Sequence, residues 1–127
     1  MKKAITYLFP LLVFNSFKSQ TKEFTILGKW QAVESSASNG AKVITHKISN
    51  GEIFIFEMKN IVKDKIGNIG TYSFQDNKLH IDLAKQHRYY ALYYKKINPE
   101  RIFLNPVTSD YQIICDEGCA FVYQKLK

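Results

Sequence analysis

The sequence predicts an all-β fold built from an antiparallel up-and-down meander. Turn signals recur roughly every ten residues after the first twenty, at Asn39-Gly40, Asn50-Gly51, Asp76-Asn77, Asn98-Pro99-Glu100 and Asn105-Pro106. Asn-Gly is a strong hairpin signal because both central residues of a type I′ turn need positive φ. Strand-like runs separate the turns, and no long segment has helical periodicity. This spacing is typical of a small barrel or sandwich of about eight to nine strands.

The first 19 residues have the layout of a secretory signal peptide. Lys2 and Lys3 precede an apolar run from Ala4 to Phe14, and a short polar stretch follows. The run is too short to span a bilayer as a mature helix, so we expect cleavage near residues 19/20. Residues 20–127 would then form a single domain that is exported, either periplasmic or secreted.

The strands expected after this leader follow the turn signals. A short helical turn at Thr21 to Ile26 can precede the first strand. The lysine-rich segment Asn60 to Asn68 contains Gly67 and is expected to be an exposed loop. The expected strands cover residues 27–35, 41–48, 52–59, 69–75, 78–83, 88–97, 101–105, 109–115 and 119–126.

The Asp76-Asn77 turn predicts one register in detail. If these two residues form the turn, one face of the hairpin is apolar and the other polar, which is the signature of a half-buried hairpin. The expected pairs are Phe74–Leu79 and Tyr72–Ile81 on the apolar face, and Ser73–His80 and Thr71–Asp82 on the polar face.

A second hairpin is predicted at the two cysteines. The run Cys115-Asp116-Glu117-Gly118-Cys119 fits a three-residue loop, because Gly118 can adopt the left-handed conformation. Export permits a disulfide between Cys115 and Cys119, worth roughly 2 kcal/mol. The spacing does not match a Cys-x-x-Cys redox motif. The same register would place Ile113 opposite Phe121 and Tyr111 opposite Tyr123.

Charge and motifs exclude several functions. The formal net charge is +7, but three of the lysines belong to the leader and the others are scattered, so we expect no nucleic-acid partner. No later apolar run is long enough for a transmembrane segment. The three histidines, His46, His80 and His87, lack metal-ligand spacing, and Glu52, Glu57 and Asp82 are expected to face away from the barrel interior. We therefore expect no metal, no cofactor and no enzyme, with catalytic residues converging from distant strands as the alternative.

The start of the first strand, Leu27-Gly28-Lys29-Trp30, resembles the lipocalin-like proteins, and in particular small exported bacterial domains of this calycin type. The resemblance implies a lipocalin-like barrel in which Gly28 allows tight packing and Trp30 plugs the closed end. Lipocalins often place an arginine from the final strand over this tryptophan. Here only Lys125 and Lys127 are available in that region.

The resemblance also implies a function, the binding of a small lipophilic molecule in the barrel. The chain has eight tyrosines and nine phenylalanines, which fit either a lined cavity or simple core filling. An alternative is a protein-binding module, an inhibitor or surface-associated partner, that uses Asp116 and Glu117 or the loop at residues 60–68. The ligand-binding residues expected inside the barrel are Phe54, Phe56, Tyr72, Tyr90, Leu92 and Tyr94.

Overall fold

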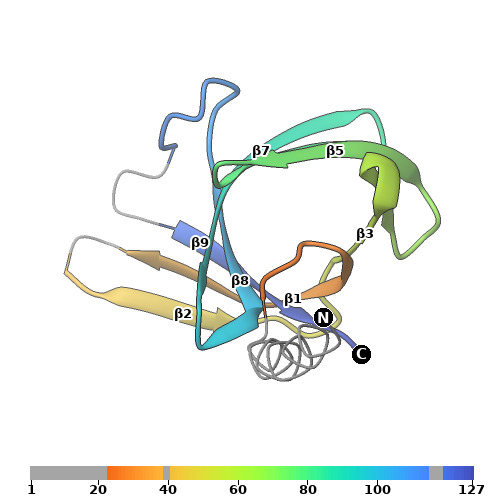
Figure 1. Cartoon of the computed structure of the whole chain (residues 1–127). Helices are drawn as coiled ribbons and strands as arrows, with labels where there is room; N and C mark the ends of the chain where they lie inside the picture. Colours follow the sequence, from red (N-terminus) through yellow and green to blue (C-terminus); the bar gives the residue numbers. More distant parts are fainter. Residues whose placement is uncertain (1–22, 39–40, 115–118) are drawn as a thin grey trace, which may run out of the picture.

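The computed structural model describes residues 23–38, 41–114 and 119–127, and in these ranges the protein is an antiparallel β-barrel (Figure 1). Eight strands close the barrel and one further strand, β2, extends from it. A single 3-10 turn, η1 (Met58–Asn60), interrupts the described strands. The strands are β1 (Gly28–Ser38), β2 (Val43–Lys47), β3 (Ile53–Glu57), β4 (Ile61–Asp64), β5 (Ile69–Gln75), β6 (Lys78–Leu83), β7 (Gln86–Lys95), β8 (Asn98–Pro106) and β9 (Cys119–Lys125). The predicted all-β meander is confirmed.

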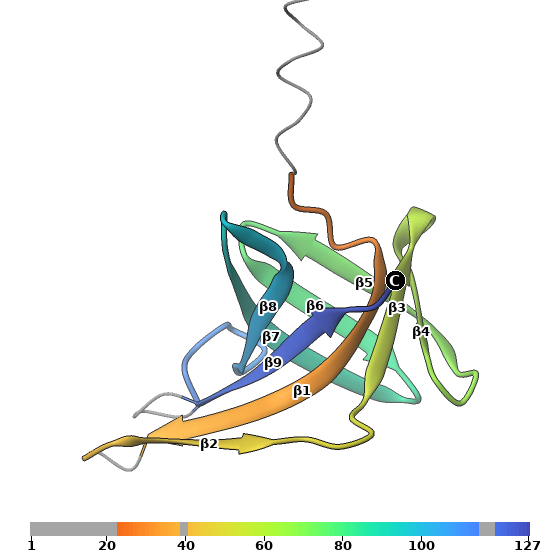
Figure 2. The ribbon, with the colours of Figure 1, turned by 90° about the horizontal axis from the view of Figure 1, so that it is seen from below.

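The long strand β1 closes the ring. Its first part pairs with β3, its last part pairs with β2, and nearly its whole length pairs with β9 on the other edge. A register shift between Ala32 and Glu34 marks a bulge in the pairing with β9. Figure 2 shows the result, in which β2 and the end of β1 project beyond the barrel. Closure leaves the eight barrel strands without an open sheet edge, which a flat meander would have.

The barrel interior is filled by side chains. Inward-facing residues alternate with outward ones, as in β6, where the buried Leu79, Ile81 and Leu83 alternate with partly or fully exposed residues. Fifteen buried residues form one contiguous core. The largest side chains with less than 2% exposure are Trp30, Phe54, Phe56, Leu79, Ile81, Leu92, Ile102, Leu104 and Val62.

One end of the barrel is sealed around Trp30. The indole Nε1–H donates a hydrogen bond of 2.7 Å to the carbonyl of Ile26, so the preceding segment lies across this end. Phe24 in that segment stacks on Tyr94, with ring centroids 4.2 Å apart, and meets Phe74 edge-on. Residues 23–27 do this without helical structure. The predicted helical turn is therefore wrong over residues 23–26, and Thr21 lies outside the described residues.

Gly28 and Lys125 complete the sealed end. The ammonium of Lys125 lies 5.1 Å from the centre of the Trp30 ring, a cation–π contact at the place where lipocalins often have an arginine. Gly28 has a φ of +128°, and a Cβ there would lie 2.7 Å from Cε of Lys125. Glycine at this position thus allows the positive φ of the backbone, and it leaves room for the side chain of Lys125 to reach Trp30.

The register predicted for the β5–β6 hairpin is confirmed. Asp76 and Asn77 have φ values of 53° and 64°, as a type I′ turn requires. All four predicted pairs are present, including Tyr72 opposite Ile81. Ala84 and Lys85, with φ values of 55° and 62°, form a similar turn between β6 and β7 that the sequence did not indicate.

Residues 60–68 are not simply a loop, because they contain β4. The lysines of this segment obscured a strand in which Val62 is fully buried while its neighbours face outward. The connection to β5 is short and is held by Asp64, whose carboxylate accepts hydrogen bonds of 2.8 Å from both the backbone and the side chain of Asn68. These hydrogen bonds hold the pKa of Asp64 below its usual value, and the bond from the side chain of Asn68 has the largest effect.

The predicted strand 109–115 and its hairpin with β9 are wrong for the residues that the structure describes. An isolated bridge between Val107 and Ile113 is present there. Both edges of β9 are occupied by β1 and β8, because this strand closes the barrel. Tyr123 lies opposite Ala32 and Ile102. Cys115 lies outside the described residues, so the disulfide with Cys119 stays a prediction.

Three other turn signals have roles different from those predicted, and one of them, Asn98-Pro99-Glu100, forms the start of a strand and not a turn. Asn50-Gly51 does not join a hairpin, since β2 and β3 both pair with β1 and not with each other. Asn105-Pro106 lies inside β8, and β8 begins at Asn98. Within the ranges described, no helix has the length and apolar character needed to cross a membrane.

The contact between Gly28 and Lys125 can be tested by comparing Gly28→Ala with Gly67→Ala. Both glycines have positive φ, but an added Cβ at Gly67 meets nothing within 4 Å. Both variants carry backbone strain of about 1–3 kcal/mol. Gly28→Ala also displaces Lys125 from Trp30 and should cost about 0.5–1 kcal/mol more in urea unfolding. In a Lys125→Ala background this excess should vanish, and an excess that persists there would contradict the account.

Candidate functional site

The end of the barrel opposite Trp30 contains a polar cluster. Glu52 of this cluster directly precedes β3. Arg88 and Tyr90 lie near the start of β7, and Tyr123 lies in β9. The register places them away from the sealed end, because Tyr123 pairs with Ala32, whereas Lys125 pairs with Trp30. We call these four residues the mouth cluster.

An ion pair holds the mouth cluster together. Nη1 of Arg88 donates hydrogen bonds of 2.9 Å to both carboxylate oxygens of Glu52. The guanidinium also lies over the ring of Phe54, 5.7 Å from its centre. Both charged side chains are about one-third exposed, which keeps the cost of removing them from water moderate. The positive charge of Arg88 is therefore already compensated within the protein.

Two tyrosine hydroxyls border this ion pair. Tyr123, only 3% exposed, donates a hydrogen bond of 3.1 Å to Oε1 of Glu52. Burial, reinforced by the nearby carboxylate, raises the pKa of Tyr123 far above its usual value. Burial also raises the pKa of Tyr90, and this outweighs the opposing effect of Arg88. Both hydroxyls thus stay neutral well into the alkaline range.

A small cavity lies at the mouth cluster. Its volume is about 220 Å³, and Ala32, Ile48 and Phe121 supply its apolar wall beside the four polar residues. Among the described residues, every buried side-chain nitrogen or oxygen has a hydrogen-bond partner. The cavity therefore combines an apolar wall with polar groups that are already satisfied. Such a site suits a small molecule with little polarity.

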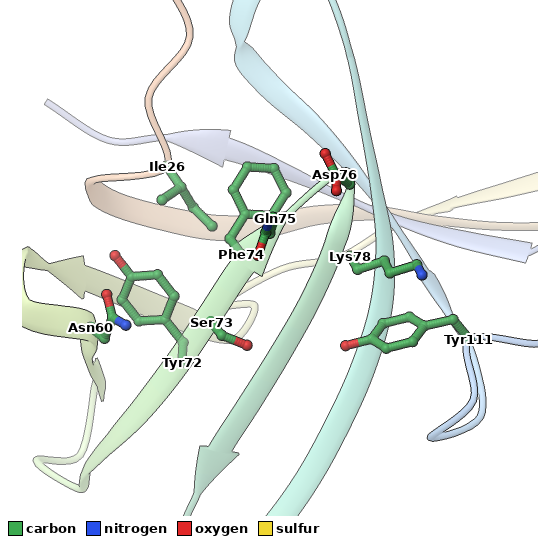
Figure 3. Close-up of a pocket in the computed structure, with 9 residues that line it drawn as sticks. All are labelled: Ile26, Asn60, Tyr72, Ser73, Phe74, Gln75, Asp76, Lys78 and Tyr111. Atoms are coloured by element: carbon green, nitrogen blue, oxygen red, sulfur yellow. The ribbon is translucent and has the colours of Figure 1, made fainter.

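A larger hollow of about 600 Å³ lies along the β5–β6 hairpin (Figure 3). Tyr72 and Phe74 of β5 face the barrel, whereas Ser73 and Gln75, which alternate with them, face outward. Lys78 and Tyr111 contact each other through a cation–π interaction on that outer side. The hollow is thus lined by residues from both faces of the hairpin, and Ile26 and Phe74 place part of it beside the sealed end. Most of its lining residues are polar, but they are spread over η1, the hairpin and the segment after β8. The polar side chains of the smaller mouth cavity are instead joined by hydrogen bonds around Glu52, so we regard that cavity as the better candidate site.

The six predicted ligand-binding residues have different positions. Phe54, Phe56, Tyr72, Tyr90 and Leu92 are buried, with exposures of 0 to 9%. Only Tyr90 of the six lines the mouth cavity. Tyr94 is 37% exposed and lies under Phe24 at the sealed end.

Sequence reasoning missed Glu52 and Arg88. Glu52 was expected to face away from the interior, but it precedes the first residue of β3 and its carboxylate reaches the mouth. Its partners Arg88 and Tyr123 are 36 and 71 residues away in the chain. No local pattern signals contacts at such separations. The prediction of an outward position is confirmed for Glu57, which forms an ion pair with Lys63 on the surface.

Comparison with known proteins adds no family assignment. No protein-family model matches the chain, and no curated protein matches it either. The eight-stranded antiparallel barrel is consistent with a lipocalin-like fold, and the functional argument therefore depends on the geometry of the site.

The raised pKa of Tyr123 predicts how stability changes at high pH. The folded state keeps the phenol proton, whereas an unfolded tyrosine loses it above a pH of about 10. The unfolded state then binds fewer protons, so stability falls as pH rises. From pH 9 to pH 11 this should cost about 1.4 kcal/mol.

The measurement is guanidinium unfolding of the wild type and Tyr123→Phe at both pH values. At pH 9 the wild type should be more stable by about 1 kcal/mol, because the variant lacks the hydrogen bond to Glu52. At pH 11 this advantage should have disappeared or reversed. An advantage of the same size at the two pH values would contradict this prediction, because Tyr123 would then lose its proton at the same pH in the folded and the unfolded state.

Proposed function

We propose that this protein is an exported, non-enzymatic lipocalin-like domain that binds a small uncharged apolar molecule at the mouth of its barrel. The observation that carries the proposal is the mouth cavity, in which the charge of Arg88 is compensated by Glu52. The sealed end around Trp30 and the apolar wall of the cavity support it. The signal-peptide layout of the first 19 residues supports export.

The filled interior limits the size of the ligand. Drug-sized ligands occupy pockets of about 300–1,000 Å³, and the mouth cavity has about 220 Å³. Phe54 packs against the guanidinium of Arg88 and is fully buried, so the filled core begins directly behind the mouth cluster. The ligand is therefore a short molecule, or the end of a longer one, held at the mouth and not along the barrel axis.

The charges at the mouth favour an uncharged ligand. A carboxylate that approached Arg88 would find both oxygens of Glu52 already bound to it and would be repelled by that side chain. A ligand with a hydroxyl or carbonyl group in place of the carboxylate is not repelled by Glu52. It can exchange hydrogen bonds with the hydroxyls of Tyr90 and Tyr123, which line the cavity.

Two ligands of equal chain length test the proposal. Titration calorimetry with 1-hexanol and with hexanoate should show that the wild type binds the alcohol more tightly, by about tenfold or more. Glu52→Gln removes the compensating carboxylate while keeping its shape. This variant should bind hexanoate more tightly than the wild type does and so reverse the preference, because Arg88 is then available to an anion.

The matched control is Glu57→Gln. Glu57 forms an exposed ion pair with Lys63, at 3.3 Å, on the outside of the barrel. This variant should keep the wild-type preference for the alcohol. If neither ligand binds the wild type, the proposed function is wrong. If binding occurs but Glu52→Gln and Glu57→Gln behave alike, the ligand site is not at the mouth.

The protein-binding module remains a second candidate because of β2. All five residues of β2 are exposed, including Val43 and Ile44, and β2 pairs with β1 but with no other described strand. An exposed edge strand can accept an extended segment of a partner. Of the contact points predicted for this function, Asp116 and Glu117 lie outside the described residues.

A further inference from the structure

Two histidines meet on the outer face of the barrel, beside the β6–β7 turn. His80 and Asp82 face outward on β6. The residues that alternate with them, Leu79, Ile81 and Leu83, are buried. His87 on β7 pairs with Asp82, and His80 lies diagonally across from it. This face is separate from the mouth cavity, whose lining includes none of these residues.

The two imidazole rings approach through specific nitrogen atoms. Nε2 of His80 forms a hydrogen bond of 3.0 Å with Nδ1 of His87, so one of these two nitrogens donates its hydrogen to the other, and a metal ion would have to displace that proton. The rings are close to parallel, with an angle of 20° between their planes. His80 also stacks on Tyr89, with centroids 4.4 Å apart and an angle of 4° between the ring planes. Tyr89 therefore fixes the plane of the His80 ring and with it the direction of its nitrogen atoms.

The separation of the two nitrogens matches that of two ligands on one metal ion. With metal–nitrogen bonds of about 2.0–2.1 Å, two adjacent ligands lie about 2.9 Å apart at a right angle and about 3.4 Å apart at the tetrahedral angle. The observed 3.0 Å is near the right-angle value. Right-angle geometry is typical of tetragonal Cu(II) and Ni(II) sites, and imidazole is a preferred ligand of both ions.

We propose that His80 and His87 form a surface binding site for a divalent transition-metal ion, with Cu(II) as the preferred ion. The ligands are Nε2 of His80 and Nδ1 of His87. His87 and Asp82 are roughly half exposed, so water can occupy the remaining coordination positions. Rotation about the broad second side-chain torsion of each histidine lets both lone pairs point to one ion. The site does not depend on the proposed ligand at the mouth.

Asp82 supports the protonation state that the metal needs. A neutral histidine carries one ring proton, and binding through these two nitrogens requires the protons to be on the opposite ones. For His87 that nitrogen is Nε2, which lies 3.9 Å from Oδ2 of Asp82, a contact longer than a hydrogen bond that a small rotation of the ring would shorten. Metal-bound histidines commonly donate this second N–H to a carboxylate. Asp82 is thus a positioning residue for His87 and not a ligand.

The site provides two protein ligands. The described residues contain no group of three or more His, Cys, Asp or Glu side chains able to hold one ion. We therefore expect a modest affinity that depends on both histidines. Binding of the second ring is intramolecular once the first has bound, so loss of either ring should weaken binding about a hundredfold or more.

Calorimetric titration of the untagged chain with Cu(II) tests the site, together with electron paramagnetic resonance of the bound ion. The wild type should bind one ion at this site with hyperfine structure from two imidazole nitrogens. His80→Ala and His87→Ala should each lose that site. Asp82→Asn should retain both nitrogen couplings and bind roughly tenfold more weakly.

His46→Ala is the matched control, since His46 is an exposed histidine on β2, away from the pair. This variant should bind Cu(II) as the wild type does. Near-ultraviolet circular dichroism of the buried Trp30 should be unchanged in every variant, which separates loss of the site from loss of the fold. The proposal is overturned if the wild type shows no two-nitrogen signal, or if that signal survives in either alanine variant of the pair.

Discussion

The packing of Trp30 is the interaction on which the rest of the structure depends. This one side chain contacts the segment before β1 through the carbonyl of Ile26 and the last strand through Lys125. Gly28 makes the approach of Lys125 possible because it has no side chain. The first and last strands, which pair with each other to close the ring, are thereby fixed at the same end of the barrel.

With one end of the barrel sealed around Trp30, the polar mouth cluster lies at the other end. The core above Trp30 is filled by aromatic and aliphatic side chains, and the polar side chains of Glu52, Arg88 and Tyr123 meet where this packing ends. Closure also gives each strand an inner and an outer face along its whole length. The outer face of β6 and β7 can therefore present His80 and His87 without any effect on the core.

The success of sequence reasoning depended on whether the relevant interaction was local. The Asp76-Asn77 hairpin was predicted residue by residue, because two adjacent residues determine its turn and register. Strand β4 was missed because lysines flank the buried Val62 and resemble a loop. The partner of β9 was wrong because barrel closure pairs it with β1, about 90 residues earlier, and no local signal outweighs that requirement. Glu52 and Arg88 of the mouth cluster were missed for the same reason, whereas Tyr90 was predicted.

The most direct test of the account is to map where an uncharged apolar ligand binds. Proton–nitrogen correlation spectra of the labelled protein, recorded as 1-hexanol is added, report on every backbone amide and on the Trp30 indole. Shifts should concentrate at the mouth, around Glu52, Arg88 and Tyr123, while the Trp30 indole signal stays in place. A shift of the indole signal together with residues 23–28, and none at the mouth, would contradict a barrel that is sealed at Trp30 and open at the other end.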